Sequence, residues 1–262
     1  MKRQFTRFTL LIVLIVGNAS VSVAQDSMSP IIRNALSYLY TPYVPHTLDD
    51  NIFEELIINK EEVDCTTFVE YVLAETLSQS ENNVDSLSEE DILLKIRYRD
   101  GIINGYPSRL HYASEWVAEG IKNLFLKDVT RNYSKDSMYV ALSYMTNHPT
   151  FYKNLQNAPE NVAAMKQVEK EASGQLIRYL PKHKVPENGL YWIKDGDIIL
   201  FTVGIYGLDV SHMGFAYYKN NKLHLLHASY PQGKVIIDPL TIRQMLDKNK
   251  KWTGIRVIRP LI

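Results

Sequence analysis

Cysteine is nearly absent from this sequence. Cys65 is the single cysteine among 262 residues, so no disulfide can form within the chain. An unpaired thiol in an oxidising compartment is a liability unless it is buried or used. Burial in the core is the simpler interpretation of a lone cysteine. The neighbours of Cys65 therefore decide between a structural and a reactive thiol.

Several other signals are missing as well. Basic and acidic residues balance at 29 each, so the basic surplus typical of nucleic-acid binders is absent and we expect no nucleic-acid partner. The sequence has no G-x-S-x-G, no Walker-type phosphate loop, no C-x-x-C and no H-E-x-x-H. Apart from His212, His224 and His227, its histidines do not cluster at spacings typical of zinc ligands. We expect neither a metal nor another cofactor.

The longest apolar run lies at the N-terminus. Three basic residues precede an apolar stretch over 8–16, and Ser22-Val-Ala24 has the small-x-small form of a signal-peptidase site. The run of about ten residues is too short for a helix that crosses a bilayer of roughly 30 Å. The pattern predicts a signal peptide over 1–24, export, and a mature domain over 25–262. After cleavage we expect no stable membrane insertion; an uncleaved anchor is the alternative.

The segment that follows Asp64 has a helical pattern. One apolar stripe with the i, i+1, i+4, i+5 spacing of a buried helix face is formed by Phe68, Val69, Val72, Leu73 and Leu77. Asp64 is suited to cap the N-terminus, because its carboxylate can accept the free backbone N–H groups of the first turn. Cys65 then lies at a helix start, where the helix dipole favours a thiolate and free N–H groups can stabilise an oxyanion. We predict that Cys65 is a nucleophile.

The last third of the chain has a different pattern. Short β-rich runs separated by Gly, Asn and Asp turns occupy 197–203, 213–218, 223–228, 234–238 and 254–260. Upstream, 113–180 is mostly helical in pattern, and Leu56–Ile58 is a short apolar run typical of a strand. Helices that precede an antiparallel sheet predict one α+β domain rather than alternating βαβ units.

A cysteine nucleophile needs a base, usually a neutral imidazole. Strand alternation places His212 on one face with Gly214 and Ala216, where small neighbours leave it room. His227, on the next strand, can lie beside His212 and fix its tautomer. His224 is an odd number of residues from His227 and should face the other way. We predict that His212 is the general base and His227 its orienting partner, against the alternative that His212 is a buried core histidine.

A polar and aromatic stretch between two glycine turns has no place in a core. It contains the candidate substrate-binding residues Arg99, Asp100, Tyr106, Ser108, Arg109, His111 and Tyr112. Arg109 could clamp a carboxylate with both guanidinium arms. A loop held together by its own Arg–Asp pairs is the equally open alternative.

Three motifs resemble those of one enzyme superfamily. Asp64-Cys-Thr-Thr-Phe-Val-Glu70 resembles the nucleophile motif of the NlpC-type cysteine peptidases, which have a papain-like fold. Ser211-His-Met-Gly-Phe215 resembles the strand with their catalytic histidine. Leu226-His-Ala-Ser229 resembles the following strand, with their third catalytic position. Thr66 and Ser211, beside the catalytic residues in these motifs, are further candidates for substrate contact.

The resemblance is greater to the N-acetylmuramoyl-L-alanine amidase-like branch of that superfamily. It extends to Arg97-Tyr-Arg-Asp-Gly101 and Gly105-Tyr-Pro-Ser-Arg-Leu-His-Tyr112, and covers about 43–260. It implies a papain-like NlpC-type fold in which N-terminal helices, with the nucleophile at a helix start, pack on a C-terminal antiparallel sheet and carry helical insertions. It also implies metal-free cleavage of the amide between N-acetylmuramic acid and L-alanine, in peptidoglycan or muropeptides of the bacterial periplasm.

Three alternatives to this activity stay open. The cut could fall on the γ-D-glutamyl–diamino acid bond of the stem peptide instead. The chain could be a non-catalytic peptidoglycan-binding module. It could also be a metal amidase that uses His212, His224 and His227 as ligands.

Overall fold

The computed structural model describes residues 28–49, 51, 53–83 and 85–262. The predicted signal peptide over 1–24 lies outside the described residues. Among the helices of the described part, none combines the length and the apolar character that crossing a membrane requires.

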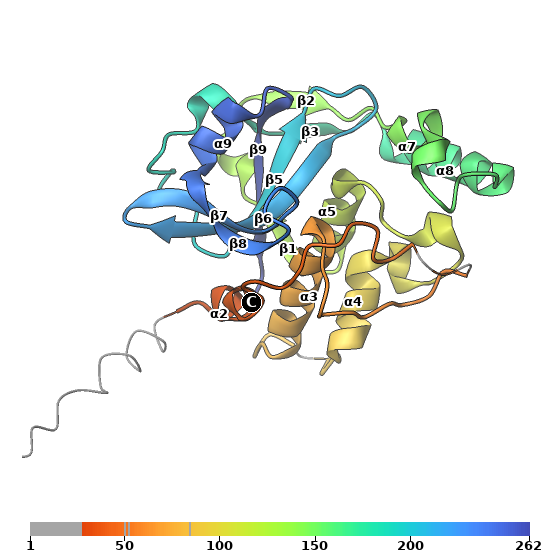
Figure 1. Cartoon of the computed structure of the whole chain (residues 1–262), viewed down its shortest axis with the longest axis horizontal. Coiled ribbons are helices and arrows are strands. Elements are labelled where there is room, and N and C mark those ends of the chain that lie inside the picture. Colours follow the sequence, from red (N-terminus) through yellow and green to blue (C-terminus); the bar gives the residue numbers. More distant parts are fainter. Residues whose placement is uncertain (1–27, 50, 52, 84) are drawn as a thin grey trace, which may run out of the picture.

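The N-terminal half of the chain is helical, as predicted. Its helices are α2 (Pro30–Ser37), α3 (Cys65–Ser78), α4 (Glu89–Arg97) and α5 (Ala113–Lys122). The predicted start of α3 is confirmed, because the Asp64 carboxylate accepts the backbone N–H groups of Thr66 and Thr67. The Thr67 hydroxyl in turn accepts the backbone N–H of Asp64, which closes a capping box. Figure 1 shows α3 and α4 side by side beneath the sheet.

The C-terminal half forms a seven-stranded antiparallel sheet in the order β1-β9-β5-β6-β7-β8, with β4 paired to β9. The strands are β1 (Leu126–Asp128), β4 (Leu180–Pro181), β5 (Ile198–Val203), β6 (Val210–Lys219), β7 (Lys222–Ser229), β8 (Lys234–Thr241) and β9 (Trp252–Pro260). The predicted α+β class and each of the five predicted C-terminal strands are thus confirmed.

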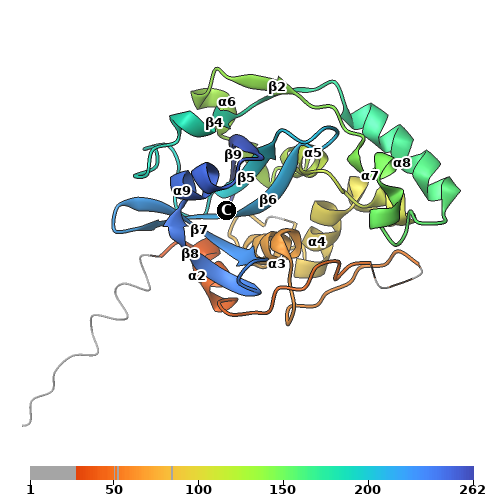
Figure 2. The same cartoon turned by 45° about the horizontal axis from the view of Figure 1, so that its top comes forward.

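The middle of the chain is less helical than predicted. Its helices are α6 (Thr130–Tyr133), α7 (Tyr144–Asn147) and α8 (Pro159–Ala172), and α9 (Ile242–Lys248) follows β8. Short 3₁₀ turns lie at η1 (Arg99–Gly101), η2 (Tyr106–Ser108), η3 (Pro149–Phe151) and η4 (Lys182–Lys184). Besides β1, it contains a separate two-stranded sheet of β2 (Ser137–Tyr139) and β3 (Leu176–Arg178). Figure 2 shows α7 and α8 together at one side of the molecule.

The strand predicted at Leu56–Ile58 is wrong. This segment has no regular secondary structure, and its backbone bonds to side chains. The carbonyl oxygen of Ile57 accepts from the guanidinium of Arg97 at 2.6 Å and from the hydroxyl of Tyr71 at 3.4 Å. An apolar run cannot by itself reveal such side-chain partners.

The sheet is covered on both faces. One hydrophobic cluster joins α2 and α3 to the sheet residues Met213, Phe215 and Leu226. A second cluster joins α9 to Phe201 and Ala216 on the opposite face. Met213 and Phe215 thus face α3, whereas Ala216 and, by strand alternation, His212 face the other way. The start of β6 is where the N-terminus of α3 reaches the sheet, because Cys65 and Met213 share one cavity there.

Candidate active site

Cys65 and His212 line the same cavity. Cys65 is the first residue of α3 and is half-buried. The cavity measures about 130 Å³ and is lined by Cys65, Thr66, Leu110, His111, Tyr112, Ala113, Trp116, Val210, Ser211, His212 and Met213. The fold therefore places Cys65 and His212, which are 147 positions apart in the sequence, on the lining of one cavity.

The Cys65 thiol is protonated at rest. Burial raises its pKa to about 12, and the Asp64 carboxylate adds to that rise. The backbone of Met213, the Thr66 hydroxyl and the backbone N–H of Cys65 itself oppose it, because they favour the thiolate. These three groups do not overcome the desolvation. Reaction at this sulfur therefore requires a base that removes its proton as the new bond forms.

His212, His227 and Asp238 form a chain of hydrogen-bonded side chains. His212 Nε2 lies 2.7 Å from His227 Nδ1, and His227 Nε2 lies 3.2 Å from Asp238 Oδ2. Burial would raise the pKa of Asp238, but the hydrogen bonds from His227 and the Leu240 N–H hold it below its ordinary value. The Asp238 carboxylate is thus ionised and can only accept, so His227 Nε2–H donates to it. In a neutral His227 ring, Nδ1 is then bare.

The hydrogen bond between His212 and His227 also determines the tautomer of His212. With a neutral His227, whose Nδ1 can only accept, the 2.7 Å contact is a bond donated by His212 Nε2–H. The other ring nitrogen, His212 Nδ1, is then unprotonated and available as a base. Burial lowers the pKa of His212 to about 3, with a further contribution from His227, so the ring is neutral at physiological pH.

Asp238 was not predicted from the sequence as a partner of His227. The pairing of β7 with β8 would have indicated it. His227 pairs with Ile236 across β7 and β8. A residue two positions further along a strand lies on the same face, which places Asp238 beside His227. The β-rich run that ends at Asp238 was predicted, but without the strand register the two residues could not be joined.

Aromatic rings pack against His212. The ring of Trp252 lies parallel to the imidazole, at 7° and 6.0 Å between centroids, and stacks on Phe201 at 4.2 Å. The indole N–H of Trp252 donates to the Ser211 hydroxyl at 2.9 Å. Gly214 makes room for this arrangement, because a Cβ there would come within 2.7 Å of His227. Trp252 is a second residue that sequence reasoning missed.

The predicted substrate-binding residues fall into two groups. Four of them line the cavity: Thr66, His111, Tyr112 and Ser211. In the second group, Arg109 is buried and pairs with Asp49 at 2.6 Å and Glu54 at 3.2 Å. Its guanidinium also lies over the Tyr106 ring at 5.1 Å.

The remaining three predicted residues, Arg99, Asp100 and Ser108, also bond to other groups of the protein. Arg99 pairs with Glu115 at 2.6 Å, and Asp100 pairs with Lys122. The Ser108 hydroxyl donates to the carbonyl oxygen of Gly105 at 2.7 Å. The ion-pair partners of this second group, Asp49, Glu54, Glu115 and Lys122, all lie outside the stretch, so these pairs are not the loop's own Arg–Asp pairs. Contact of the second group with a substrate stays a prediction.

His224 does not join the hydrogen-bonded chain of His212, His227 and Asp238. Its Nδ1 lies 2.9 Å from the backbone carbonyl oxygen of Asp238. Across the part of the chain that the structure describes, no three His, Cys, Asp or Glu side chains gather as metal ligands. His212, His224 and His227 consequently form no shared ligand set.

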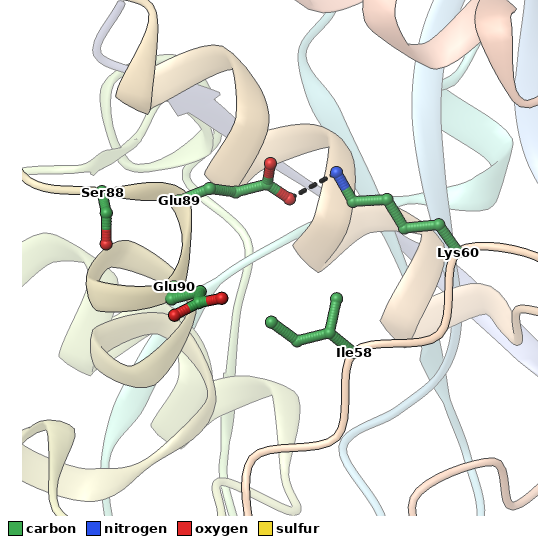
Figure 3. A pocket seen from close by; sticks show the side chains of 5 residues that line it. All are labelled: Ile58, Lys60, Ser88, Glu89 and Glu90. Carbon is green, nitrogen blue, oxygen red and sulfur yellow. Dashed lines mark ion pairs between the residues drawn. The ribbon is translucent and has the colours of Figure 1, made fainter.

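A larger hollow lies elsewhere on the molecule. It is lined by Ile58, Lys60, Ser88, Glu89 and Glu90, and Figure 3 shows the Lys60–Glu89 ion pair across it, 2.5 Å long. Ser88 caps α4, so its hydroxyl already bonds the first turn of that helix. The described lining of this hollow includes no cysteine and no histidine, and we do not assign the chemistry to it.

Residues 34–255 match the family described as N-acetylmuramoyl-L-alanine amidase-like. Among solved structures, an N-acetylmuramoyl-L-alanine amidase from Bacteroides uniformis is 52% identical, with a TM-score of 0.85 over 89% of this chain and 98% of that one. A protein from Bacteroides fragilis named as a candidate xylanase is 50% identical, with a TM-score of 0.83 over 87% and 99%.

A more distant structure shares the fold alone. It is the protein LPG0564 from Legionella pneumophila, which is 23% identical with a TM-score of 0.68 over 92% of each chain. A search of curated proteins found no match.

Proposed function

The chain belongs to the N-acetylmuramoyl-L-alanine amidase-like family, and on that premise we propose that it is a cysteine hydrolase of the bacterial cell wall. The bond it cleaves is the amide between N-acetylmuramic acid and L-alanine, in peptidoglycan or in muropeptides. The observation that carries the proposal is the shared cavity of Cys65 and His212, with His212 held by His227 and Asp238.

The first half of the reaction forms an acyl-enzyme. His212 Nδ1 takes the proton of the Cys65 thiol while the sulfur attacks the amide carbonyl carbon. The carbonyl oxygen becomes an oxyanion, which the backbone N–H groups at the start of α3 stabilise. When this intermediate collapses, the C–N bond breaks and His212 gives its proton to the departing amine of L-alanine.

The second half releases the sugar. Water loses a proton to His212 Nδ1 and attacks the thioester carbon. The C–S bond then breaks, the sulfur recovers its proton from His212, and the muramoyl product leaves as a carboxylic acid. His227 and Asp238 act in both halves, since their hydrogen bonds hold His212 through Nε2 and leave its Nδ1 free to act as the base. No step of this scheme needs a metal.

The lining of the cavity favours the muramoyl bond over the γ-D-glutamyl bond. An acyl group derived from D-glutamate carries a free carboxylate, which needs a cationic partner when it leaves water. Among the described residues that line the cavity, none is Lys or Arg. The lactoyl group of N-acetylmuramic acid is uncharged and fits apolar walls such as Leu110, Ala113 and Val210.

A glycosidase, as the name of the Bacteroides fragilis protein suggests for that protein, needs different chemistry. Most glycosidases place two carboxylates on either side of the bond that they break. The described lining of this cavity includes no Asp or Glu. The nucleophile, the base and the uncharged walls together support amide hydrolysis.

We further propose the papain-like NlpC-type fold and the periplasm as location. The order of elements supports the fold: a helix that starts with the nucleophile precedes an antiparallel sheet that carries the base and its partner on neighbouring strands. The signal-peptide pattern over 1–24 supports export. Edman sequencing or mass spectrometry of the mature N-terminus tests it, with a start at Gln25 as the expected result.

A defined disaccharide-peptide tests the activity. The wild type should release a peptide with a free L-alanine N-terminus, whereas Cys65→Ala and His212→Ala should release none above background. His183→Ala, which changes an exposed histidine of η4, is the matched control and should keep full activity. Products cut after γ-D-glutamate would replace the amidase by an endopeptidase, and binding without turnover would indicate a binding module. Loss of activity with a strong chelator would reopen the metal mechanism.

A further inference from the structure

A second imidazole at the cavity has no part in the steps above. His111 lies just before α5, and its Nε2 is 2.9 Å from the backbone carbonyl oxygen of Tyr106. A carbonyl oxygen can only accept a hydrogen bond, so His111 Nε2 carries the proton. The other ring nitrogen, Nδ1, is therefore a bare acceptor.

The surroundings of His111 keep this tautomer in place. The imidazole packs on the ring of Tyr106 at 4.4 Å between centroids. Burial lowers the pKa of His111 to about 3, and the charge of Arg109 adds to that effect. Arg109 is itself fixed by its ion pairs with Asp49 and Glu54. The ring is thus neutral and bound through one nitrogen.

The other polar side chains that line the cavity differ from His111 in the hydrogen bonds that they can make. The hydroxyl of Tyr112 is already engaged, since it donates to Glu169 at 2.7 Å and accepts the backbone N–H of Met145 at 3.0 Å. Thr66 and Ser211 carry hydroxyls, which can donate as well as accept. His111 Nδ1 can only accept, so it discriminates in favour of a substrate group that donates.

We propose that His111 Nδ1 accepts a hydrogen bond from an uncharged N–H of the sugar fragment, and so selects an N-acetylated amino sugar over one with a free amine. This inference rests on the proposed function. A free amine is an ammonium at physiological pH, and apolar walls together with nearby Arg109 disfavour a second positive charge there. An acetamido group presents a neutral N–H instead.

Paired substrates test this selection. Wild type, His111→Leu and His111→Asn are compared on an N-acetylmuramoyl-L-alanyl peptide and on its de-N-acetylated counterpart. The wild type should prefer the acetylated substrate in kcat/KM, and His111→Leu should lower that preference about tenfold because the acceptor is lost. His111→Asn places an amide oxygen near the position of Nδ1 and should keep most of the preference. An unchanged ratio in His111→Leu would overturn the inference and leave the amidase proposal intact.

A second measurement does not depend on turnover or on the fold of the His111 variants. In Cys65→Ala protein with ¹⁵N-labelled histidine, His111 Nδ1 should resonate as an unprotonated ring nitrogen. Its signal should move when N-acetylmuramoyl-L-alanine is added, and should not move with the de-N-acetylated compound. A proton found on Nδ1, or a signal that ignores the acetylated ligand, contradicts the proposal. Failure of the wild type to cleave any muropeptide would instead contradict the proposed function.

Discussion

His212 Nε2 lies 2.7 Å from His227 Nδ1, and this contact decides which nitrogen of His212 can act as a base. The proton order begins at the ionised Asp238, passes through His227 and leaves His212 Nδ1 bare. In the proposed mechanism, His227 takes the place of the single carboxylate or amide that usually orients a catalytic histidine. Two consecutive hydrogen bonds, from His212 to His227 and from His227 to Asp238, therefore hold the proposed base in place.

The first prediction concerns His227 and Asp238, the two residues that hold His212. We expect His227→Ala to lower kcat by about 10²- to 10⁴-fold, because His212 loses the partner that fixes its tautomer. Asp238→Asn should cost less, about tenfold, since the amide oxygen can still accept from His227 Nε2–H. Steady-state kinetics on the disaccharide-peptide measure both, with KM changing little. Wild-type kcat in His227→Ala would remove these two residues from the mechanism.

The second prediction is the pH dependence of kcat/KM. His212 acts as a base only when its ring is neutral, and its pKa is lowered to about 3 by burial and by His227. Activity is therefore lost when the pH falls toward this value, and not near the ordinary imidazole pKa of about 6.5. The acid limb should lie well below pH 6. A limb centred at pH 6.5 would show that His212 is solvated like a free histidine.

Much of this site follows from local sequence patterns. The helix start at Cys65 is readable because Asp64 and the apolar stripe after it are neighbours in the chain. The pairing of His212 with His227 is readable because β6 and β7 are joined by a tight turn, so simple strand alternation brings the two side chains together. Both inferences need only short-range rules.

The parts that escaped prediction depend on long-range register. Asp238 reaches His227 only through the pairing of β7 with β8, which includes an irregularity after His224. Trp252 reaches His212 through β9, which arrives beside β5 from the end of the chain. Two arginines of the 97–109 stretch pair with acidic residues far upstream, Arg97 with Glu70 and Arg109 with Asp49. The sequence pattern of a single segment cannot predict these contacts, because they join segments that are far apart in the chain.

The third prediction separates the two roles of Asp64. Its carboxylate caps α3, but its charge also raises the pKa of the Cys65 thiol, after burial. Asp64→Asn should keep the cap and lower the thiol pKa, so alkylation of Cys65 by iodoacetamide at pH 8 should become faster. Asp64→Ala should also destabilise the protein by about 1 kcal/mol, because the first turn loses its acceptor. Equal alkylation rates in wild type and Asp64→Asn would contradict the electrostatic role.

The fourth prediction concerns a buried ion pair behind the site. Glu70 and Arg97 are both almost completely buried, and Glu70 Oε2 accepts from Arg97 Nε at 2.8 Å. Glu70→Ala should lower the free energy of unfolding by about 3–5 kcal/mol, because it leaves a buried guanidinium without its partner. Urea denaturation measures this loss. Asp247→Ala, which breaks the exposed pair with Arg243, is the control and should cost less than about 1 kcal/mol.

The fifth prediction assigns a positioning role to Trp252. Its ring lies parallel to His212, where the π face can stabilise the imidazolium that forms when Cys65 loses its proton. Trp252→Leu should lower kcat about tenfold and move the acid limb of the pH profile further down, because the imidazolium loses that stabilisation. Trp252→Phe keeps an aromatic face and gives up only the hydrogen bond to Ser211, so it should recover most of kcat. Should both variants lose the same activity with the acid limb unmoved, Trp252 would be a packing residue of the second hydrophobic cluster and no more.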